Sequence, residues 1–160
     1  MRSPSWLADV DISTVICVLH GSEEEDLGEN LLVQDDLDIS FISLNCDDDD
    51  SSSSSWDSLC RVLPAFLSSF TEALERGGNV LICDPTGFSS SVALLSIFLL
   101  LKFQTRIETT EELCVKARPC VYLSLSHRRG LRAAQARLDQ LQMKRMNSKL
   151  RTSSVVSLAF

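Results

Sequence analysis

The sequence has little of what marks several special classes of protein. Only six of its 160 residues are glycine and four are proline, which excludes a collagen-like or low-complexity chain. The six cysteines form no C-x-x-C pair, so the sequence favours neither a zinc module nor a disulfide framework, and we expect no metal and no cofactor. Such cysteines are typical of a reducing compartment, and we therefore expect a cytoplasmic location, with the nucleus as a second one.

Long apolar runs are also missing. The longest, residues 92–101, is interrupted by Ser96 and is too short to span a bilayer. The first residues lack the apolar core of a signal peptide. The sequence therefore predicts a soluble, intracellular chain without a membrane span.

Positive charge is scarce in the first third of the chain. Residues 1–57 contain fifteen acidic residues and a single arginine, whereas bases predominate in residues 58–160 and especially after Ser126. A basic helix suits an acidic protein, a nucleic acid or a membrane surface, but a solvated helix face is the commoner cause. We interpret residues 143–160 as a basic, frayed tail, and we do not expect nucleic acid to be the partner.

Strand and helix patterns alternate along the rest of the chain. Apolar, β-branched runs predict strands at 12–19, 41–44 and 79–83, the last of which is typical of a central parallel strand. Apolar residues at helical spacing predict a helix over 56–76 that ends at Gly77-Gly78, and residues 89–101 are apolar on nearly every side, as in a buried helix. This order predicts an α/β three-layer sandwich, in which helices flank a short parallel or mixed central sheet.

Two more helices and one loop complete the expected domain. Helices are predicted at 109–116 and 127–146, the second with Leu131, Leu138 and Leu141 facing inward. Residues 47–55 are four aspartates and five serines with nothing to bury, so we expect a mobile acidic loop over 45–55. Serines beside carboxylates also suit acidophilic kinases, which we keep as a hypothesis.

The segment between the 79–83 strand and the buried helix is the strongest candidate site. Backbone N–H groups and the helix dipole converge at such a junction and favour an anion. The lysine of the G-x-x-x-x-G-K-[ST] phosphate loop and the three glycines of the dinucleotide loop are both missing.

Residues 80–91, VLICDPTGFSSS, align without a gap with the V-L-V-H-C-x-x-G-x-S-R-S segment of the atypical dual-specificity phosphatases. The chain therefore resembles that family, within the protein tyrosine phosphatase superfamily, and the Arg118-Pro119 pair and the last helix fit the same order. The resemblance implies a dual-specificity-phosphatase-like domain over residues 7–142. It also implies a binding loop made of Asp84, Pro85, Thr86, Gly87, Phe88, Ser89, Ser90 and Ser91.

Both catalytic groups of the family are replaced in this loop. Asp84 stands where the family has its nucleophilic cysteine, and Ser90 stands where it has the phosphate-binding arginine. No shift of register restores the pair. The resemblance therefore implies a degenerate, STYX-like pseudophosphatase in which no catalytic set is intact.

The charge of Asp84 also argues against phosphatase activity. Two unit charges ~4 Å apart at an effective dielectric constant near 20 repel by about 4 kcal/mol, so an ionised Asp84 opposes an anionic substrate. Residues 77–101 contain no lysine or arginine to offset that repulsion. We predict that cysteine-type phosphatase turnover is abolished.

Other chemistry is less well supported. The resemblance makes Asp47 the positional candidate for a general acid, but an aspartate in a serine-rich tract has no fixed geometry. An aspartyl-phosphate enzyme would place metal-binding carboxylates after Asp84, where they are few. For His20 and His127 we expect capping or surface roles. We assign Cys83 no nucleophilic role, because Asp84 beside it should not lower its pKa.

The leading hypothesis is a catalytically inactive domain that acts as a protein-interaction or scaffold module. Its expected partner is a protein, such as a phosphoprotein or a component of a kinase pathway. The alternative is residual phosphatase activity on phosphotyrosine, phosphoserine or phosphothreonine, or an esterase-type reaction, in the same pocket. The sequence favours the module over the enzyme.

Overall fold

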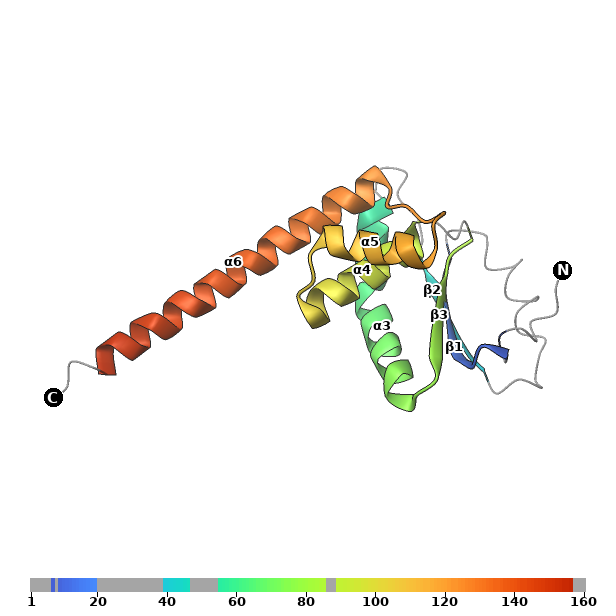
Figure 1. Cartoon of the computed structure of the whole chain (residues 1–160), viewed down its shortest axis with the longest axis horizontal. Coiled ribbons are helices and arrows are strands. Elements are labelled where there is room, and N and C mark those ends of the chain that lie inside the picture. The colour runs from blue at the N-terminus through green and yellow to red at the C-terminus, as the bar shows by residue number, and fades with distance from the viewer. Residues whose placement is uncertain (1–6, 8, 20–38, 47–54, 86–88, 157–160) are drawn as a thin grey trace.

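A computed structural model describes residues 7, 9–19, 39–46, 55–85 and 89–156 of the chain. These residues form three strands and four helices, and Figure 1 shows their arrangement. In chain order they are β1 (Ile12–Leu19), β2 (Ser40–Asn45), α3 (Ser55–Arg76), β3 (Asn79–Cys83), α4 (Ser90–Phe103), α5 (Ile107–Ala117) and α6 (Leu125–Val156). The predicted α/β class, its three strands and its four helices are confirmed.

The described strands make one parallel sheet in the order β2-β1-β3. β1 lies in the middle, and its Cys17 is the register partner of Ser43 in β2 and of Cys83 in β3. The prediction that residues 79–83 form a central strand was wrong within this sheet, because β3 pairs with β1 alone. The four apolar residues of Asn79–Cys83 predict a strand, but they do not show which neighbours the strand has.

The two faces of β1 belong to two different clusters. Ile16 and Val18 are fully buried on the face that the helices cover, together with α3 and α4 side chains such as Phe66 and Leu94. Val15, Cys17 and Leu19 point to the opposite face, where they pack with Leu7. This alternation follows from the two-residue period of a strand. All four helices lie on one side of the sheet in Figure 1.

Two glycines join α3 to β3. Gly77 has φ 88° and Gly78 has φ 80°, in the left-handed region that favours glycine. A side-chain carbon on Gly78 would also lie 2.6 Å from the Ser13 hydroxyl of β1. The predicted end of the helix at Gly77-Gly78 is therefore confirmed, and the turn brings β3 directly alongside β1.

Helix α4 is the buried helix that its sequence predicted. Leu94, Ile97 and Leu100 are at most 4% exposed, and Phe98 meets Phe70 of α3 edge to face with ring centroids 4.7 Å apart. Such burial on most sides fixes both ends of α4 relative to the sheet. The first turn of α4, with Ser90 and Ser91, is therefore part of a rigid element.

Helix α6 is longer than predicted and leaves the body of the molecule. Its first turns pack on α5, where the Gln135 amide oxygen accepts a hydrogen bond from the Ile107 N–H at 3.1 Å. Leu131 is buried and Leu138 is half-buried, but Leu141 is 48% exposed, so the prediction that Leu141 faces inward was wrong. The reason is visible in Figure 1, where the helix continues past the end of α4. The boundary between a domain at 7–142 and a tail at 143–160 stays a prediction.

Within the part of the chain that the structure describes, no helix combines the length and the apolar character needed to cross a membrane. α6 is long enough at 32 residues, but its sequence is polar.

Candidate functional site: the loop between β3 and α4

The predicted binding loop lies where β3 ends and α4 begins. Asp84 and Pro85 follow the strand, and Ser89 immediately precedes the helix, in which Ser90 and Ser91 are the first two residues. The other predicted loop residues, Thr86, Gly87 and Phe88, lie outside the described residues, as does the general-acid candidate Asp47.

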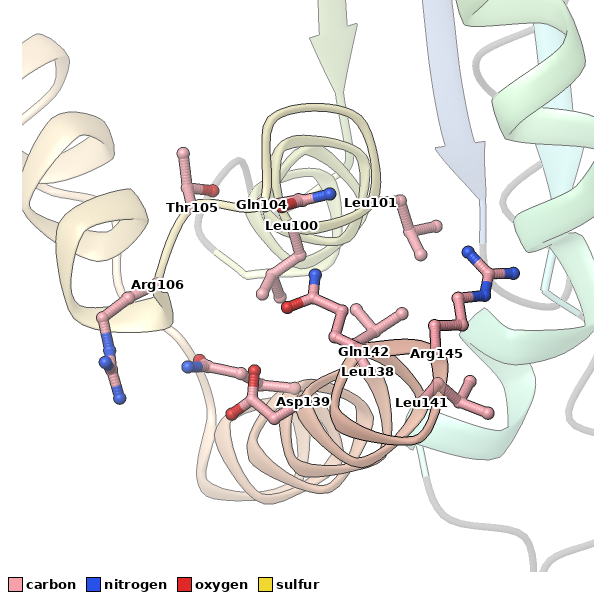
Figure 2. A pocket seen from close by; sticks show the side chains of 11 residues that line it. Leu100, Leu101, Gln104, Thr105, Arg106, Leu138, Asp139, Leu141, Gln142 and Arg145 are labelled. Atoms are coloured by element: carbon pink, nitrogen blue, oxygen red, sulfur yellow. The ribbon is translucent and has the colours of Figure 1, made fainter. Parts of the chain in front are cut away.

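A surface hollow lies at the opposite end of α4. Figure 2 shows Leu100 of α4 and Gln104, which follows α4, across the hollow from Leu138 and Gln142 of α6. A helix rises about 1.5 Å per residue, so the ten residues between Ser90 and Leu100 separate the hollow from the loop by about 15 Å. The hollow is therefore not part of the loop that the resemblance implies as the phosphate site.

Asp84 is directed onto the first turn of α4. Its carboxylate Oδ2 accepts hydrogen bonds from the backbone N–H of Ser91 at 3.0 Å and from the Ser91 hydroxyl at 2.5 Å. Asp84 is 9% exposed, and both of these hydrogen bonds are buried. The side chain that the sequence alignment assigns to the position of the family's nucleophile is therefore bonded to the helix that follows the loop.

The carboxylate of Asp84 acts as the cap of α4. The residue at the usual capping position, Ser89, makes no side-chain hydrogen bond to the helix. The N–H of Ser91 is one of the helix's first donors, which have no partner within the helix, and Asp84 satisfies it with a negative charge. A negative charge at the start of a helix is favoured by the helix dipole. The anion position predicted for this junction is thus held by a side chain of the protein itself.

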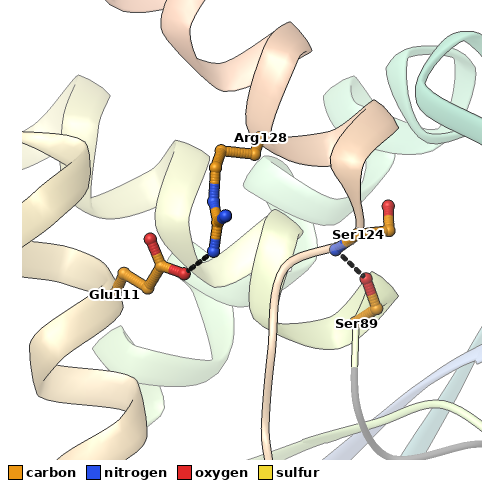
Figure 3. Close-up of polar contacts among 4 residues, drawn as sticks. All are labelled: Ser89, Glu111, Ser124 and Arg128. Carbon is orange, nitrogen blue, oxygen red and sulfur yellow. Dashed lines mark hydrogen bonds and ion pairs between the residues drawn. The ribbon is translucent and has the colours of Figure 1, made fainter.

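Ser89 faces the start of α6 instead of its own helix. Its hydroxyl oxygen lies 2.8 Å from His127 Nδ1 and accepts a hydrogen bond from the Ser124 N–H at 3.0 Å, a contact drawn in Figure 3. His127 is only 2% exposed, so the expectation of a surface role for this histidine was wrong. Local sequence patterns carry no signal for this contact, because 38 residues separate the two partners.

Arg128 follows His127 in α6, but its side chain contacts α5. Its guanidinium pairs with the carboxylate of Glu111 in α5, and Figure 3 shows the pair beside the contact between Ser89 and Ser124. The interaction joins α6 to α5. This arginine therefore does not supply the guanidinium that is missing at Ser90, which is itself buried at 8% exposure in the first turn of α4.

Comparison with solved structures reveals the relationship of this fold. Human DUSP28 superposes with a TM-score of 0.64 and 16% identity, over 86% of this chain and 83% of that one. The human tyrosine phosphatase-like serine/threonine/tyrosine-interacting protein gives a TM-score of 0.61 and 18% identity over 82% of each chain. DUSP15 superposes with a TM-score of 0.58 and 14% identity, over 90% of this chain and 85% of that one. The chain has the fold of a dual-specificity phosphatase domain. No family model and no curated protein sequence matches it.

The phosphatase fold agrees with the sequence alignment of the loop. The parallel strand β3 precedes Asp84 and the buried helix α4 begins at Ser90, in the order that the alignment requires. In the described part of the chain, no group of three or more histidine, cysteine, aspartate or glutamate side chains is arranged to hold a metal.

Two cysteines that are far apart in the sequence are in contact next to Asp84. The sulfurs of Cys17 in β1 and Cys83 in β3 lie 3.1 Å apart. Their hydrogen bond raises the pKa of Cys83, and burial, the charge on Cys17 and the neighbouring Asp84 act in the same direction. The same hydrogen bond lowers the pKa of Cys17, although burial opposes it. The prediction that the pKa of Cys83 is not depressed is therefore confirmed.

Proposed function

We propose that this chain is a member of the protein tyrosine phosphatase superfamily that has lost phosphatase chemistry and acts as a protein-interaction module. The observation that carries the proposal is the Asp84 carboxylate on the first turn of α4, bonded to the N–H and the hydroxyl of Ser91. In the active family a thiolate at this position attacks phosphorus, and an arginine holds the phosphoryl oxygens.

A phosphoryl group entering this loop would meet an unfavourable site. It would compete with Asp84 for the Ser91 donors and would approach a negative charge, with a repulsion of order 4 kcal/mol at ~4 Å. Ser90 cannot replace the two-pronged hydrogen bonding of a guanidinium. We therefore propose a pseudophosphatase of the STYX-like kind, and residual hydrolysis in the same pocket is the outcome that argues against it.

The surface of α6 supports an interaction role. Its outer part carries the exposed apolar side chains of Leu141, Met143 and Met146 together with the bases Lys144 and Arg145. Apolar side chains beside positive charge suit an acidic protein surface, such as that of a phosphoprotein or a kinase-pathway component. Because all six cysteines are free thiols, we propose that the module works in the cytoplasm and the nucleus.

The test is hydrolysis of an aryl phosphate by the purified full-length chain and by the Asp84→Cys/Ser90→Arg variant. The proposal predicts no turnover above buffer for the native chain, and measurable turnover for the variant because it regains both thiolate and guanidinium. The matched control, Asp84→Ser/Ser90→Arg, restores the arginine without a thiolate and should stay inactive. Turnover by the native chain that survives Ser90→Ala but disappears in Asp84→Ala would overturn the proposal.

A further inference from the structure

Cys17 and Cys83 form a pair on the face of the sheet opposite helices α3 to α6. They are register partners on the adjacent strands β1 and β3, and both belong to the cluster around Leu7 and Val15. Their sulfurs are 3.1 Å apart, although 66 residues separate them in sequence. Cys17 is 6% exposed, and Cys83 is half-buried.

The backbone at this pair suits a covalent bond. Neighbouring strands lie about 4.7–4.9 Å apart, which falls within the Cα separation of about 4.4–6.8 Å that disulfides require. Because an S–S bond is about 2.05 Å long, the sulfurs need to approach by about 1 Å. Rotation of two side chains on a shared face supplies such a movement more easily than a shift of the strands.

We propose that Cys17 and Cys83 are a site of reversible oxidation, at which a peroxide converts the two thiols into a disulfide between β1 and β3. This property goes beyond the proposed interaction role, and it does not use the family's nucleophile position, which is Asp84. Catalytic turnover of phosphate plays no part in it. The oxidant is a small hydroperoxide such as hydrogen peroxide.

The reaction balances in two steps. The Cys17 thiolate attacks one peroxide oxygen, the O–O bond breaks, and the departing hydroxide takes up a proton to become water. Cys83 then attacks the Cys17 sulfur, the S–O bond breaks, and the hydroxide that leaves takes the Cys83 proton to form a second water. The two sulfurs lose two electrons, and the peroxide gains them. A dithiol reductant reverses the change.

Cys17 is suited to the first step and Cys83 to the second. The shared hydrogen bond favours the thiolate at Cys17, which is the nucleophilic form of the group. Cys83 is held at contact distance, so the intermediate on Cys17 has a partner thiol beside it. The exposed thiols of Cys60 and Cys120 have no cysteine partner among the described hydrogen bonds.

The bond would tie the sheet together directly before the loop. Cys83 is the last residue of β3, so a disulfide there anchors the strand end from which Asp84 projects. Closing a loop of 66 residues restricts the unfolded chain, and the oxidised protein should therefore melt several degrees higher than the reduced one.

The experiment treats the full-length chain with hydrogen peroxide, alkylates the remaining thiols after denaturation and maps the peptides without reduction. The proposal predicts an intrachain peptide that joins Cys17 to Cys83, a mass lower by two hydrogen atoms, and recovery of both thiols with dithiothreitol. The Cys60→Ser/Cys120→Ser variant removes the exposed thiols and should give the same linked peptide and the same rise in melting temperature.

Peptide mapping of the native chain decides the question even if a Cys17→Ser or Cys83→Ser variant fails to fold. Full alkylation of both residues after peroxide treatment would overturn the proposal. It would also be overturned if oxidation only linked two chains through Cys60 or Cys120, or only produced sulfinic acid at Cys83. Failure here would leave the aryl phosphate result unaffected, so the two proposals are judged separately.

Discussion

At the scale of single residues, Asp84 has a structural task that follows from its chemistry. Its carboxylate accepts hydrogen bonds from the N–H and the hydroxyl of Ser91 in the first turn of α4. Without Asp84, this buried N–H would be left without a hydrogen-bond acceptor. A carboxylate makes stronger hydrogen bonds than a thiol, so an aspartate caps this helix better than the cysteine that the alignment gives the phosphatase family at this position.

Asp84→Ala should lower the free energy of unfolding by about 1–2 kcal/mol, the usual cost of losing a helix-capping side chain. Urea denaturation followed by circular dichroism measures this change. The matched control is Asp139→Ala, at an exposed position of α6, which should change stability little.

A double-mutant cycle identifies the cause of that loss. Ser91→Ala should be costly in the native chain and much less costly in the Asp84→Ala background, since the two side chains bond to each other. Ser68→Ala, on the exposed side of α3, should show no such coupling. An Asp84→Ala chain as stable as the native one would contradict the capping role.

Part of the site could be predicted at this scale and part could not. The positions of Asp84 and Ser90 follow from an ungapped alignment, because the loop is a local segment between two predicted elements. The contact of Ser89 with His127 depends on where α6 starts in space, and the Cys17–Cys83 contact depends on strand register. Neither is encoded in local spacing.

At the scale of elements, α6 is held to α3 by a contact that requires a glycine. A side-chain carbon on Gly130 would overlap the ring of Trp56 in the first turn of α3. The missing side chain lets the indole lie against the backbone of α6. A glycine that weakens the helix locally thereby permits the packing of two elements far apart in sequence.

Gly130→Ala should destabilise the protein, although alanine is the better helix former by about 1 kcal/mol. Overpacking typically costs about 1–3 kcal/mol, and this cost should exceed the gain in helix propensity. The control, Ala133→Gly at an exposed position of the same helix, should cost about 1 kcal/mol through propensity alone. Thermal unfolding of the three chains checks the prediction, and a more stable Gly130→Ala chain would show that Trp56 does not pack against this glycine.

The bounds of the strands along the chain could be predicted from the sequence better than their neighbours in the sheet. Residues 12–19 and 79–83 form strands at the predicted bounds, since runs of β-branched and apolar residues favour strands locally. The edge position of β3 and the exposure of Leu141 are properties of the assembled domain, and periodicity along one segment cannot report them.

At the scale of the whole molecule, the outer part of α6 contributes exposed surface and little core. Every residue from Asp139 to Met146 is exposed, whereas Leu138 is still half-buried. Figure 1 shows α6 extending past the end of α4 toward its own C-terminal end, and Leu141, Gln142 and Arg145 line the hollow between the two helices. The stability of the domain should therefore depend on α6 only up to Leu138.

A chain that ends at Leu138 should unfold within about 0.5 kcal/mol of a chain that ends at Met146, because every residue between these two ends is exposed. A chain that ends at Arg137 also loses the half-buried Leu138 and should be less stable. Urea unfolding of the three truncated chains distinguishes these cases. A large loss of stability between the Met146 and Leu138 ends would mean that residues 139–146 pack against the domain, which would argue against their role as an interaction surface.

We infer that Asp84 already holds the anion position of this phosphatase fold. Titration of inorganic phosphate into the isotopically labelled chain, with the amide signal of Ser91 followed by nuclear magnetic resonance, tests this inference. We expect the signal to stay where it is as phosphate is added, because the Ser91 N–H is bonded to the Asp84 carboxylate. A saturable shift of the Ser91 amide in the native chain, with loss of the bond to Asp84, would contradict it.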